Sequence, residues 1–228
     1  MSDLSGQVCL VTGASRGFGF ACARALGRAG AHVVALARTT GGLEELDEAI
    51  RPGGGAATLV PLDITDDEGL ARLGAALHER FGHVDLWLHT AAYAPPMAPA
   101  EHVGAKELDT ALAVNVRAYS RLIRVIDPLL RAAPAGRAVN AADTPANPRF
   151  FALYGATKAA QAAMTASWAA EATGKITVSE IVPPAMPTAL RGRFHPGEGR
   201  AGLTDPAEAA ERFVAALPDL APGGRIAL

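Results

Sequence analysis

The segment Val8–Gly19 reads VCLVTGASRGFG and joins an apolar run to a glycine-rich turn. The run Val8–Val11 is apolar at every position, a pattern typical of a parallel strand that is buried on both faces. Gly13, Gly17 and Gly19 follow, and a helical stretch comes after them. Such glycines let the backbone turn sharply and approach a pyrophosphate, while the N-terminus of the helix points at the anion. The segment therefore predicts a strand, a turn and a helix that together bind a dinucleotide.

Short apolar runs alternate with helical stretches along the rest of the chain. Strands are predicted at Gln7–Thr12, His32–Leu36, Ala57–Pro61, Val84–Leu88, Arg137–Ala141, Ile176–Val182 and Arg225–Ala227. Helices are predicted near residues 18–29, 43–50, 66–81, 105–132, 152–172 and 206–216. This alternation predicts an α/β fold, a Rossmann-type doubly wound parallel sheet of about seven strands with helices on both faces.

Helix boundaries and loops indicate a single domain over residues 1–228. Asp205 and Pro206 provide an N-cap and a proline at the first helical position, and acidic residues at 66–68 suit a helix start. Pro128 lies inside the 105–132 stretch and is expected to kink it or to end its first part. The stretches rich in proline and glycine at 52–55, 95–99 and 183–199 are interpreted as loops rather than as domain linkers.

The charge and cysteine content exclude several classes of protein. The 228 residues carry a formal charge of 21 − 23 = −2, and Lys and Arg form no run. A nucleic-acid binder or a membrane-surface protein would show a basic patch or a basic amphipathic helix, so neither partner is expected. No apolar stretch approaches the roughly 20 residues of a membrane span. Cys9 and Cys22 are interpreted as buried, reduced thiols, and we expect a cytoplasmic protein.

Five motifs in sequence order extend the argument from the turn to most of the chain. Thr12–Gly19 matches the pattern TGxxxGxG, and Tyr154–Lys158 matches YxxxK. With Asp63, Asn115 and Thr188 at matching places, the chain resembles the short-chain dehydrogenase/reductase family. The resemblance implies an NAD(P)-dependent oxidoreductase that transfers a hydride between nicotinamide and a carbonyl or alcohol substrate.

The resemblance also implies a catalytic set of Tyr154, Lys158 and Asn115. Tyr154 and Lys158 are four residues apart at the start of a helix, so their side chains share a face. A free tyrosine has a pKa of about 10, which a neighbouring ammonium is expected to lower. In the family the tyrosine donates a proton to the carbonyl, and the lysine also holds the nicotinamide ribose. Asn115 would hold a water that links Lys158 to solvent.

The cofactor contacts implied by the family pattern span both halves of the chain. An NAD-preferring site usually ends its second strand with an acidic residue, but Ala37 stands here and Arg38 follows. Arg38 and Arg16 can pair with a 2′-phosphate, which favours NADP(H) over NAD(H); the alternative is that both arginines are solvated surface residues. The expected contacts are Gly13, Ser15, Arg16, Gly17, Phe18, Gly19, Arg38, Asp63, Ile64, Ala91, Tyr154, Lys158, Pro183 and Thr188.

The sequence departs from the family in three places. The NNAG segment is replaced by His89–Ala92, and the PG turn by Pro183-Pro184. His89 is interpreted as a structural substitute, and no second His or Cys accompanies it as a metal ligand. The catalytic serine is missing: counting back from Tyr154 gives residues 140–142, and alignment on Gly136-Arg137 gives Asp143. Either Asp143 points away while water or Thr144 substitutes, or Asp143 is protonated, or the site is nearly inactive.

The predicted activity is therefore a slow one, and the competing hypothesis is an NADP-binding sensor or scaffold that has lost catalysis. The substrate loop is expected at about residues 186–204. The residues of this loop do not identify the substrate. The expected walls are largely apolar: Tyr93, Pro95, Pro96, Met97, Phe150, Phe151 and Met186, with Arg149, Arg191 and Arg193 near the rim. The alanine-rich helix after Tyr154 predicts close packing between the subunits of a homodimer or homotetramer. The alternative interpretation is that the alanines only give the helix a high helix propensity.

Overall fold

The computed structural model describes residues 3–143, 149–172 and 174–228. Within these residues, seven parallel strands form one sheet in the order β3-β2-β1-β4-β5-β6-β7. The strands are β1 (Val8–Thr12), β2 (His32–Ala37), β3 (Ala56–Pro61), β4 (Leu86–His89), β5 (Arg137–Ala141), β6 (Thr177–Val182) and β7 (Arg225–Ala227). The predicted fold class is confirmed.

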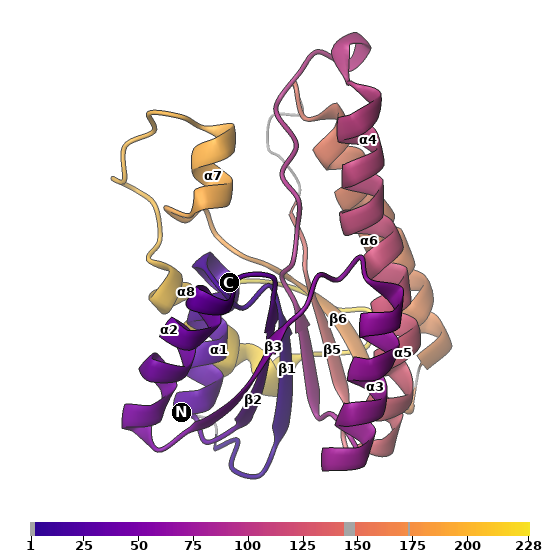
Figure 1. The fold of residues 1–228 in the computed structure, drawn as a ribbon. Coiled ribbons are helices and arrows are strands. Elements are labelled where there is room, and N and C mark those ends of the chain that lie inside the picture. Colours follow the sequence, from indigo (N-terminus) through magenta and orange to yellow (C-terminus); the bar gives the residue numbers. More distant parts are fainter. Residues whose placement is uncertain (1–2, 144–148, 173) are drawn as a thin grey trace.

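Helices cover both faces of the sheet (Figure 1). One face carries α1 (Gly17–Arg28), α2 (Thr40–Ile50) and α8 (Pro206–Ala216). The other carries α3 (Asp67–Phe81), α5 (Ala118–Ala132) and α6 (Ala152–Ala172). The core follows this division, because one buried cluster lies under each helix layer. The central strands β1 and β4 are buried along their whole length, as the unbroken apolar runs predict, whereas the edge strands β3 and β7 are partly exposed.

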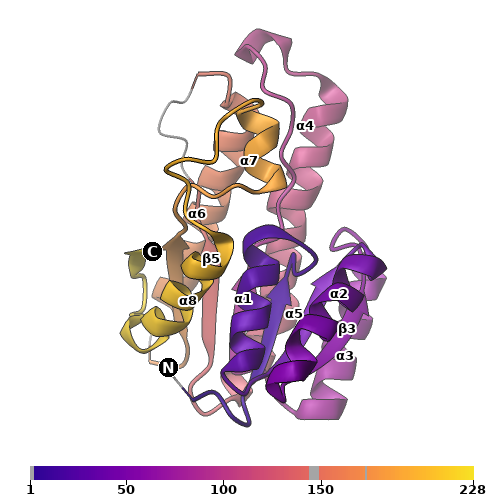
Figure 2. The same ribbon diagram turned by 90° about the vertical axis from the view of Figure 1, so that its left-hand side faces the viewer.

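Two short helices lie beyond the carboxyl ends of the strands, α4 (Ala105–Ala111) and α7 (Ala189–Phe194) (Figures 1 and 2). The sequence did not predict α7 as a helix, because its six residues fall inside a stretch rich in proline and glycine. The predicted strand Val84–Leu88 is observed as Leu86–His89. Val84 and Asp85 instead bond through their N–H groups to Leu129 and Val8.

The predicted helix at 105–132 is divided, but not at proline. A π-helical segment, Leu112–Arg117, separates α4 from α5. α5 continues through Pro128 to Ala132, so the prediction that Pro128 ends the first part is wrong. Pro128 lies near the end of α5, so few helical hydrogen bonds follow it and the missing N–H of proline interrupts little of the helix.

The predicted caps and thiols are observed. Asp66 accepts a hydrogen bond from the Gly69 N–H at 3.0 Å, and Asp205 accepts one from the Ala207 N–H at 2.7 Å. Cys9 and Cys22 are buried and free. In the described part of the chain, no helix is long and apolar enough to cross a membrane.

Candidate active site

The glycine turn lies where strand order reverses, at the carboxyl ends of the neighbouring strands β1 and β4. Gly13 has a φ of 87°, and its N–H donates to the Leu36 carbonyl at 2.8 Å. A Cβ on Gly13 would lie 2.7 Å from the backbone nitrogen of Ala91. The turn and the segment after β4 are therefore packed backbone against backbone, which only glycine permits.

The N-terminus of α1 faces this turn without a side-chain cap. Its N-cap is Arg16, an exposed residue in an extended conformation, whose side chain makes no cap hydrogen bond. α2 begins in the same way after Thr39, which also makes no side-chain cap bond. Uncapped N-termini present N–H donors and a positive dipole end to an anion.

The predicted adenine and 2′-phosphate contacts lie at the ends of β2 and β3. Arg38 is 3.8 Å from the Asp63 carboxylate, and both side chains are largely exposed. Asp63 also accepts hydrogen bonds from the N–H and hydroxyl of Thr65, at 2.9 and 2.8 Å. Ile64 is buried and Ala37 closes β2. Arg38 thus stands at the predicted position beside Asp63, on the open side of the sheet.

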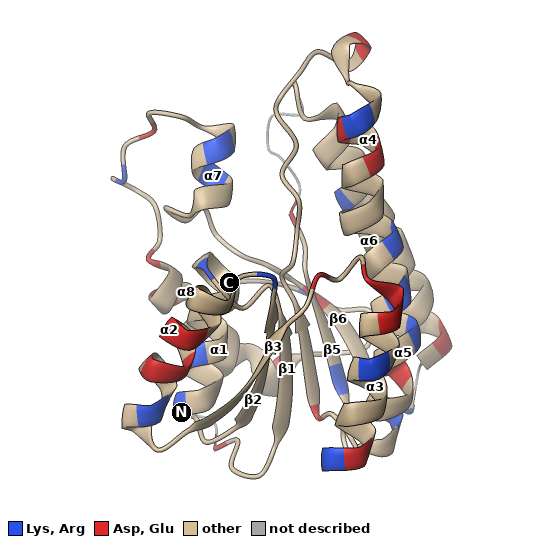
Figure 3. Cartoon of the chain, viewed as in Figure 1, with Lys and Arg blue, Asp and Glu red and all other residues tan. Residues whose placement is uncertain are grey.

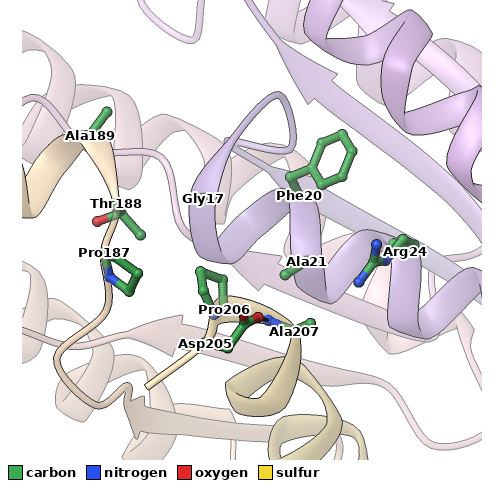
Figure 4. A pocket seen from close by; sticks show the side chains of 10 residues that line it. All are labelled: Gly17, Phe20, Ala21, Arg24, Pro187, Thr188, Ala189, Asp205, Pro206 and Ala207. Atoms are coloured by element: carbon green, nitrogen blue, oxygen red, sulfur yellow. Dashed lines mark hydrogen bonds between the residues drawn. The ribbon is translucent and has the colours of Figure 1, made fainter. Parts of the chain in front are cut away.

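A cavity of about 330 Å³ lies beside α1, between it, the segment before α7 and the start of α8 (Figure 4). Gly17 of the glycine turn and Thr188 both line this cavity and lie close together, since a Cβ on Gly17 would lie 3.3 Å from the Thr188 methyl group. Thr188 also caps α7 by accepting from the Arg191 N–H at 3.3 Å. The lining residues are Gly17, Phe20, Ala21, Arg24, Pro187, Thr188, Ala189, Asp205, Pro206 and Ala207.

Tyr154 and Lys158 lie side by side in the first turns of α6, and both are nearly buried. The Tyr154 hydroxyl donates to the Asp143 carboxylate at 2.7 Å. Burial, then the Asp143 charge and this hydrogen bond, raise the pKa of Tyr154 above its ordinary value. This direction is opposite to the lowering expected from the ammonium alone, because burial disfavours the charged phenolate and the Asp143 anion lies against the hydroxyl.

Asp143 occupies the position predicted for the missing serine and points at Tyr154. The expectation that it points away is wrong in the described structure. The carboxylate is exposed on its other side. Thr144, the alternative hydroxyl, lies outside the described residues.

Lys158 is held from the inner side of the site. Its Nζ donates to the Ala141 carbonyl at 2.8 Å and to Oε1 of Gln161 at 2.6 Å. Burial lowers the pKa of Lys158 to about 8, against the raising influence of Asp143 and Glu180.

Asn115 is fully buried in the π-helical segment and ties two elements together. Its side-chain oxygen accepts from the Tyr93 N–H at 2.7 Å, and its amide donates to the Tyr93 carbonyl at 2.9 Å and to Thr157 at 3.0 Å. Its own backbone carbonyl accepts from Nε2 of Gln161 at 2.7 Å. Asn115 therefore lies next to the Tyr–Lys pair as predicted, with its amide engaged by protein.

His89 lies below this pair and acts as a structural group in the described chain. It is 1 % exposed, and its Nδ1 is 2.7 Å from the Thr12 hydroxyl. Burial, then the charge of Lys158, lower the pKa of His89 to about 3, so the ring is neutral near pH 7. No group of three or more His, Cys, Asp or Glu side chains in the described residues is arranged to hold a metal ion.

Aromatic rings form the wall above Tyr154. The rings of Phe151 and Phe194 lie 6.4 and 4.8 Å from the Tyr154 ring, and 4.9 Å from each other. Phe194 comes from α7, which also carries Arg191 and Arg193 (Figure 3). Of the predicted apolar wall, Phe151 lies against Tyr154, together with Phe194, which was not predicted; Met97 and Phe150 are exposed.

Further contacts hold the rim of this wall. The Tyr93 hydroxyl donates to the Glu107 carboxylate, and the Arg193 guanidinium lies 5.7 Å from the centre of the Tyr93 ring. Arg191 pairs with Glu198 through two hydrogen bonds of 2.5 and 2.6 Å. The replaced turn at Pro183-Pro184 follows β6 directly, and the described residues contain no cis peptide bond.

Two residues of the site were not singled out from the sequence, Gln161 and Phe194. Gln161 could have been found, because it is a polar residue one turn after Lys158 on the same face of a predicted helix. Phe194 belongs to a helix that the sequence pattern did not reveal.

Comparisons with known proteins agree with this geometry. A family model described as short chain dehydrogenase matches residues 7–199. The 3beta-hydroxysteroid dehydrogenase 1 of Eggerthella lenta is 33% identical over 205 residues, which cover 87% of this chain and 78% of that protein. The fatty acyl-CoA reductase of Acinetobacter baylyi is 31% identical over 192 residues and 82% of this chain. The match spans 65% of that reductase, slightly less than two thirds of its length.

Solved structures show the same fold. A metagenomic short-chain oxidoreductase in complex with NADP superposes with a TM-score of 0.82 at 28% identity, over 100% of both chains. A short chain dehydrogenase from Shigella flexneri has a TM-score of 0.91 at 24% identity, over 100% of this chain and 92% of that one. The chain belongs to the short-chain dehydrogenase family, whose members are oxidoreductases acting on small molecules.

Proposed function

We propose that the protein is an NADP(H)-dependent oxidoreductase that interconverts a carbonyl compound and its alcohol with slow turnover. The observation that carries this proposal is the buried pair Tyr154–Lys158, with the Asp143 carboxylate against the Tyr154 hydroxyl. The family supplies the reaction type, and the residues of this chain supply the reason for the low rate.

The residues fit a dinucleotide. The Gly13 turn leaves no room for a side chain, and the first-turn N–H groups of α1 and α2 have no side-chain cap. These donors suit the pyrophosphate and a 2′-phosphate. Arg38 and Arg16 favour NADP(H), because Ala37 puts no acidic group where a ribose hydroxyl would be bound. A similar chain of known structure is in complex with NADP.

Bound nicotinamide would supply or accept the hydride at the substrate carbon. Tyr154 is the proton donor in reduction, and the Lys158 ammonium stabilises negative charge on its oxygen. Asp143 opposes this step, since its carboxylate accepts the hydrogen bond of the Tyr154 hydroxyl, holds the proton on Tyr154 and faces the oxygen on which negative charge develops. Loss of one preorganised donor there costs about 10² to 10³ in rate, and an anion adds repulsion. The apolar wall of Phe151 and Phe194 favours a substrate with an apolar body.

The test combines turnover with cofactor binding. Tyr154→Phe should reduce carbonyl turnover about 10²- to 10⁴-fold, because it removes the proton donor, while NADPH affinity stays within about twofold. Calorimetry measures binding, and a panel of apolar ketones, aldehydes and alcohols at saturating cofactor measures rate. A Tyr154→Phe variant that turns over at the native rate would contradict the proposal.

A sensor or scaffold that binds NADP(H) is the second candidate. It is favoured by the Tyr154–Asp143 bond and by the cover of Phe194 over Tyr154, both of which oppose catalysis. The two candidates differ in the same panel. Tight NADPH binding without turnover on any substrate, in the native protein and in Asp143→Ser, would favour the sensor.

We also propose a homo-oligomer assembled through α6. The exposed positions of α6 form a stripe of alanines at helical spacing, and Leu108 of the neighbouring α4 and Leu112 at the start of the π-helical segment are also exposed. Small residues let helices approach closely, and exposed leucines are typical of contact surfaces. Ala163→Glu should dissociate the oligomer in light scattering, whereas Ala75→Glu on the exposed side of α3 should not. A native monomer at micromolar concentration would refute this part of the proposal.

The cytoplasm remains the proposed location. The free, buried thiols Cys9 and Cys22 are compatible with a reducing compartment. Fractionation of cells that express the tagged chain tests it.

A further inference from the structure

Gln161 is buried directly beneath the Tyr–Lys pair, and none of the roles assigned so far accounts for it. Its side chain is 0 % exposed on α6, one turn after Lys158. A buried amide without partners would cost free energy, so its contacts determine what it does. It makes two short hydrogen bonds to groups of the site, 2.6 Å to Lys158 and 2.7 Å to the Asn115 carbonyl.

The orientation of the Gln161 amide is fixed by chemistry. The Lys158 ammonium can only donate, so it must face the amide oxygen. The Asn115 carbonyl can only accept, so it must face the amide nitrogen. The second N–H of this nitrogen is directed toward Nε2 of neutral His89, at the longer distance of 3.5 Å. The amide therefore bridges the ammonium and the π-helical segment in one orientation only.

The bridge occupies one of the three N–H donors of Lys158 and so limits which donors remain for other acceptors. An ammonium has three N–H donors, and among the described residues two are used, on Ala141 and Gln161. Neither acceptor can take up or release a proton near neutral pH. The two bonded N–H groups of Lys158 therefore face acceptors that do not exchange a proton, and the third N–H has no hydrogen-bond acceptor among the described residues.

We propose that Gln161 is a positioning residue that holds the Lys158 ammonium charged and aimed at the Tyr154 side of the site. It also fixes α6 to the π-helical segment through the Asn115 carbonyl. The catalytic meaning of this role rests on the proposed function. The role itself is a property of the protein without substrate.

The charge state of Lys158 reports on the bridge. Burial lowers the pKa of Lys158 to about 8. The charged or titratable groups around it are Tyr154 on the same helix, Asp143 after β5, Glu180 on β6 and His89 at the end of β4. The amide oxygen is a neutral acceptor that favours the ammonium form. Its removal should lower the pKa of Lys158 further.

The chain offers a direct measurement, because it contains three lysines, Lys106, Lys158 and Lys175. Lys106 and Lys175 are exposed, so replacing both with arginine leaves Lys158 as the single lysine. NMR of ¹³Cε-labelled lysine in that background then follows one signal through its titration. Gln161→Leu and Gln161→Met are each expected to lower the pKa of Lys158 by about 1. Two variants are used so that one misfolded protein does not decide the result.

Thr165→Val is the matched control. Thr165 is buried one turn further along α6 and bonds to Tyr119 and to the Gln161 carbonyl, without contact to Lys158. This variant removes a buried polar group from the same helix and should leave the pKa of Lys158 unchanged. Equal titration of Lys158 in native protein and in folded Gln161 variants would overturn the proposal, as would an equal shift in Thr165→Val.

The activity measurement is kept separate. If carbonyl reduction is observed, its rate should fall above the pKa of Lys158, and this alkaline limb should move to lower pH in the Gln161 variants. If no turnover is found, the proposed function fails while the NMR titration still decides the role of Gln161.

Discussion

Two regions of the candidate site differ in the kind of contact that forms them: the proposed cofactor side, around the turn at Gly13, and the proposed catalytic side, around Lys158. Around the turn at Gly13, the contacts are backbone against backbone, and the helix starts at Gly17 and Thr40 are uncapped. Around Lys158, the contacts are buried side chains bonded to one another. The first region presents unused donors, and the second has most of its donors satisfied internally.

This difference indicates how each region responds to change. A surface made of backbone groups is altered only by steric intrusion, because almost any side chain can be replaced without touching the N–H groups. A network of side chains is altered by single exchanges of charge or hydrogen bonding, because each member depends on its neighbours. The cofactor side should therefore govern affinity, and the catalytic side protonation and rate.

The largest effect is expected from a steric change on the cofactor side. A Cβ on Gly19 would collide with the Gly13 carbonyl and the Thr90 hydroxyl, so Gly19→Ala must open the turn. NADPH affinity should fall about 100-fold, equivalent to about 2.7 kcal/mol. Gly53→Ala, where the added atom meets only ordinary contact at 3.6 Å, is the control. Undiminished binding in a folded Gly19→Ala protein would show that the turn does not hold the cofactor.

A change of charge tests the catalytic side. Asp143→Ser replaces the acceptor on Tyr154 by a hydroxyl that can donate to a substrate oxygen. Carbonyl reduction should rise between about 10- and 100-fold, part of the 10² to 10³ that one such donor provides. Ala142→Ser, one residue away, should not reproduce the gain. Brisk native turnover that Asp143→Ser does not increase would contradict the assignment.

The buried His89 should make the catalytic side sensitive to acid. The pKa of His89 is about 3 when folded and near 6.5 when unfolded, so the unfolded state binds an extra proton as pH falls through this interval. Stability is thus lost below pH 6.5, by about 2 to 3 kcal/mol between pH 6.5 and 4.5. Urea unfolding at several pH values should give a shallower acid loss for His89→Asn. Parallel curves for the two proteins would argue against a neutral, buried ring.

The smallest effect concerns cofactor choice. Arg38→Asp should reduce NADPH affinity about tenfold and leave NADH affinity equal or slightly higher, since a charge-assisted hydrogen bond is replaced by repulsion. Calorimetric titration of both cofactors measures the ratio. Equal affinities of the native protein for NADPH and NADH would remove the basis of this prediction.

The sequence predicted the sheet and the glycine turn well because glycine spacing and unbroken apolar runs report backbone requirements directly, while the cofactor contacts stay predictions. Gly13, Gly17 and the seven strands could be placed from local pattern alone. The catalytic side was predicted only in part. Tyr154 and Lys158 were identified by the match to the YxxxK motif, but a local pattern does not show which groups of other elements meet them.

Three structural features illustrate why. Asp143 faces Tyr154 because β5 ends against α6, and Gln161 reaches the Asn115 carbonyl because a π-helical segment interrupts the 105–132 stretch. Phe194 covers Tyr154 from a six-residue helix whose sequence resembles a loop. Each depends on tertiary contacts between segments far apart in sequence, which single-segment propensities cannot report.

The pairing of β1 with β4 also affects how fast and in which order the chain folds. Cys9 lies opposite Leu86, so this junction joins segments separated by three α-helices, a short 3-10 helix and two strands. Closing so long a loop costs entropy before any contact compensates it, and sheets with such connections fold slowly. The cleft exists only after this junction has formed. A dinucleotide can therefore not guide the early steps of folding, but by binding only the completed junction it would shift the equilibrium toward the native state.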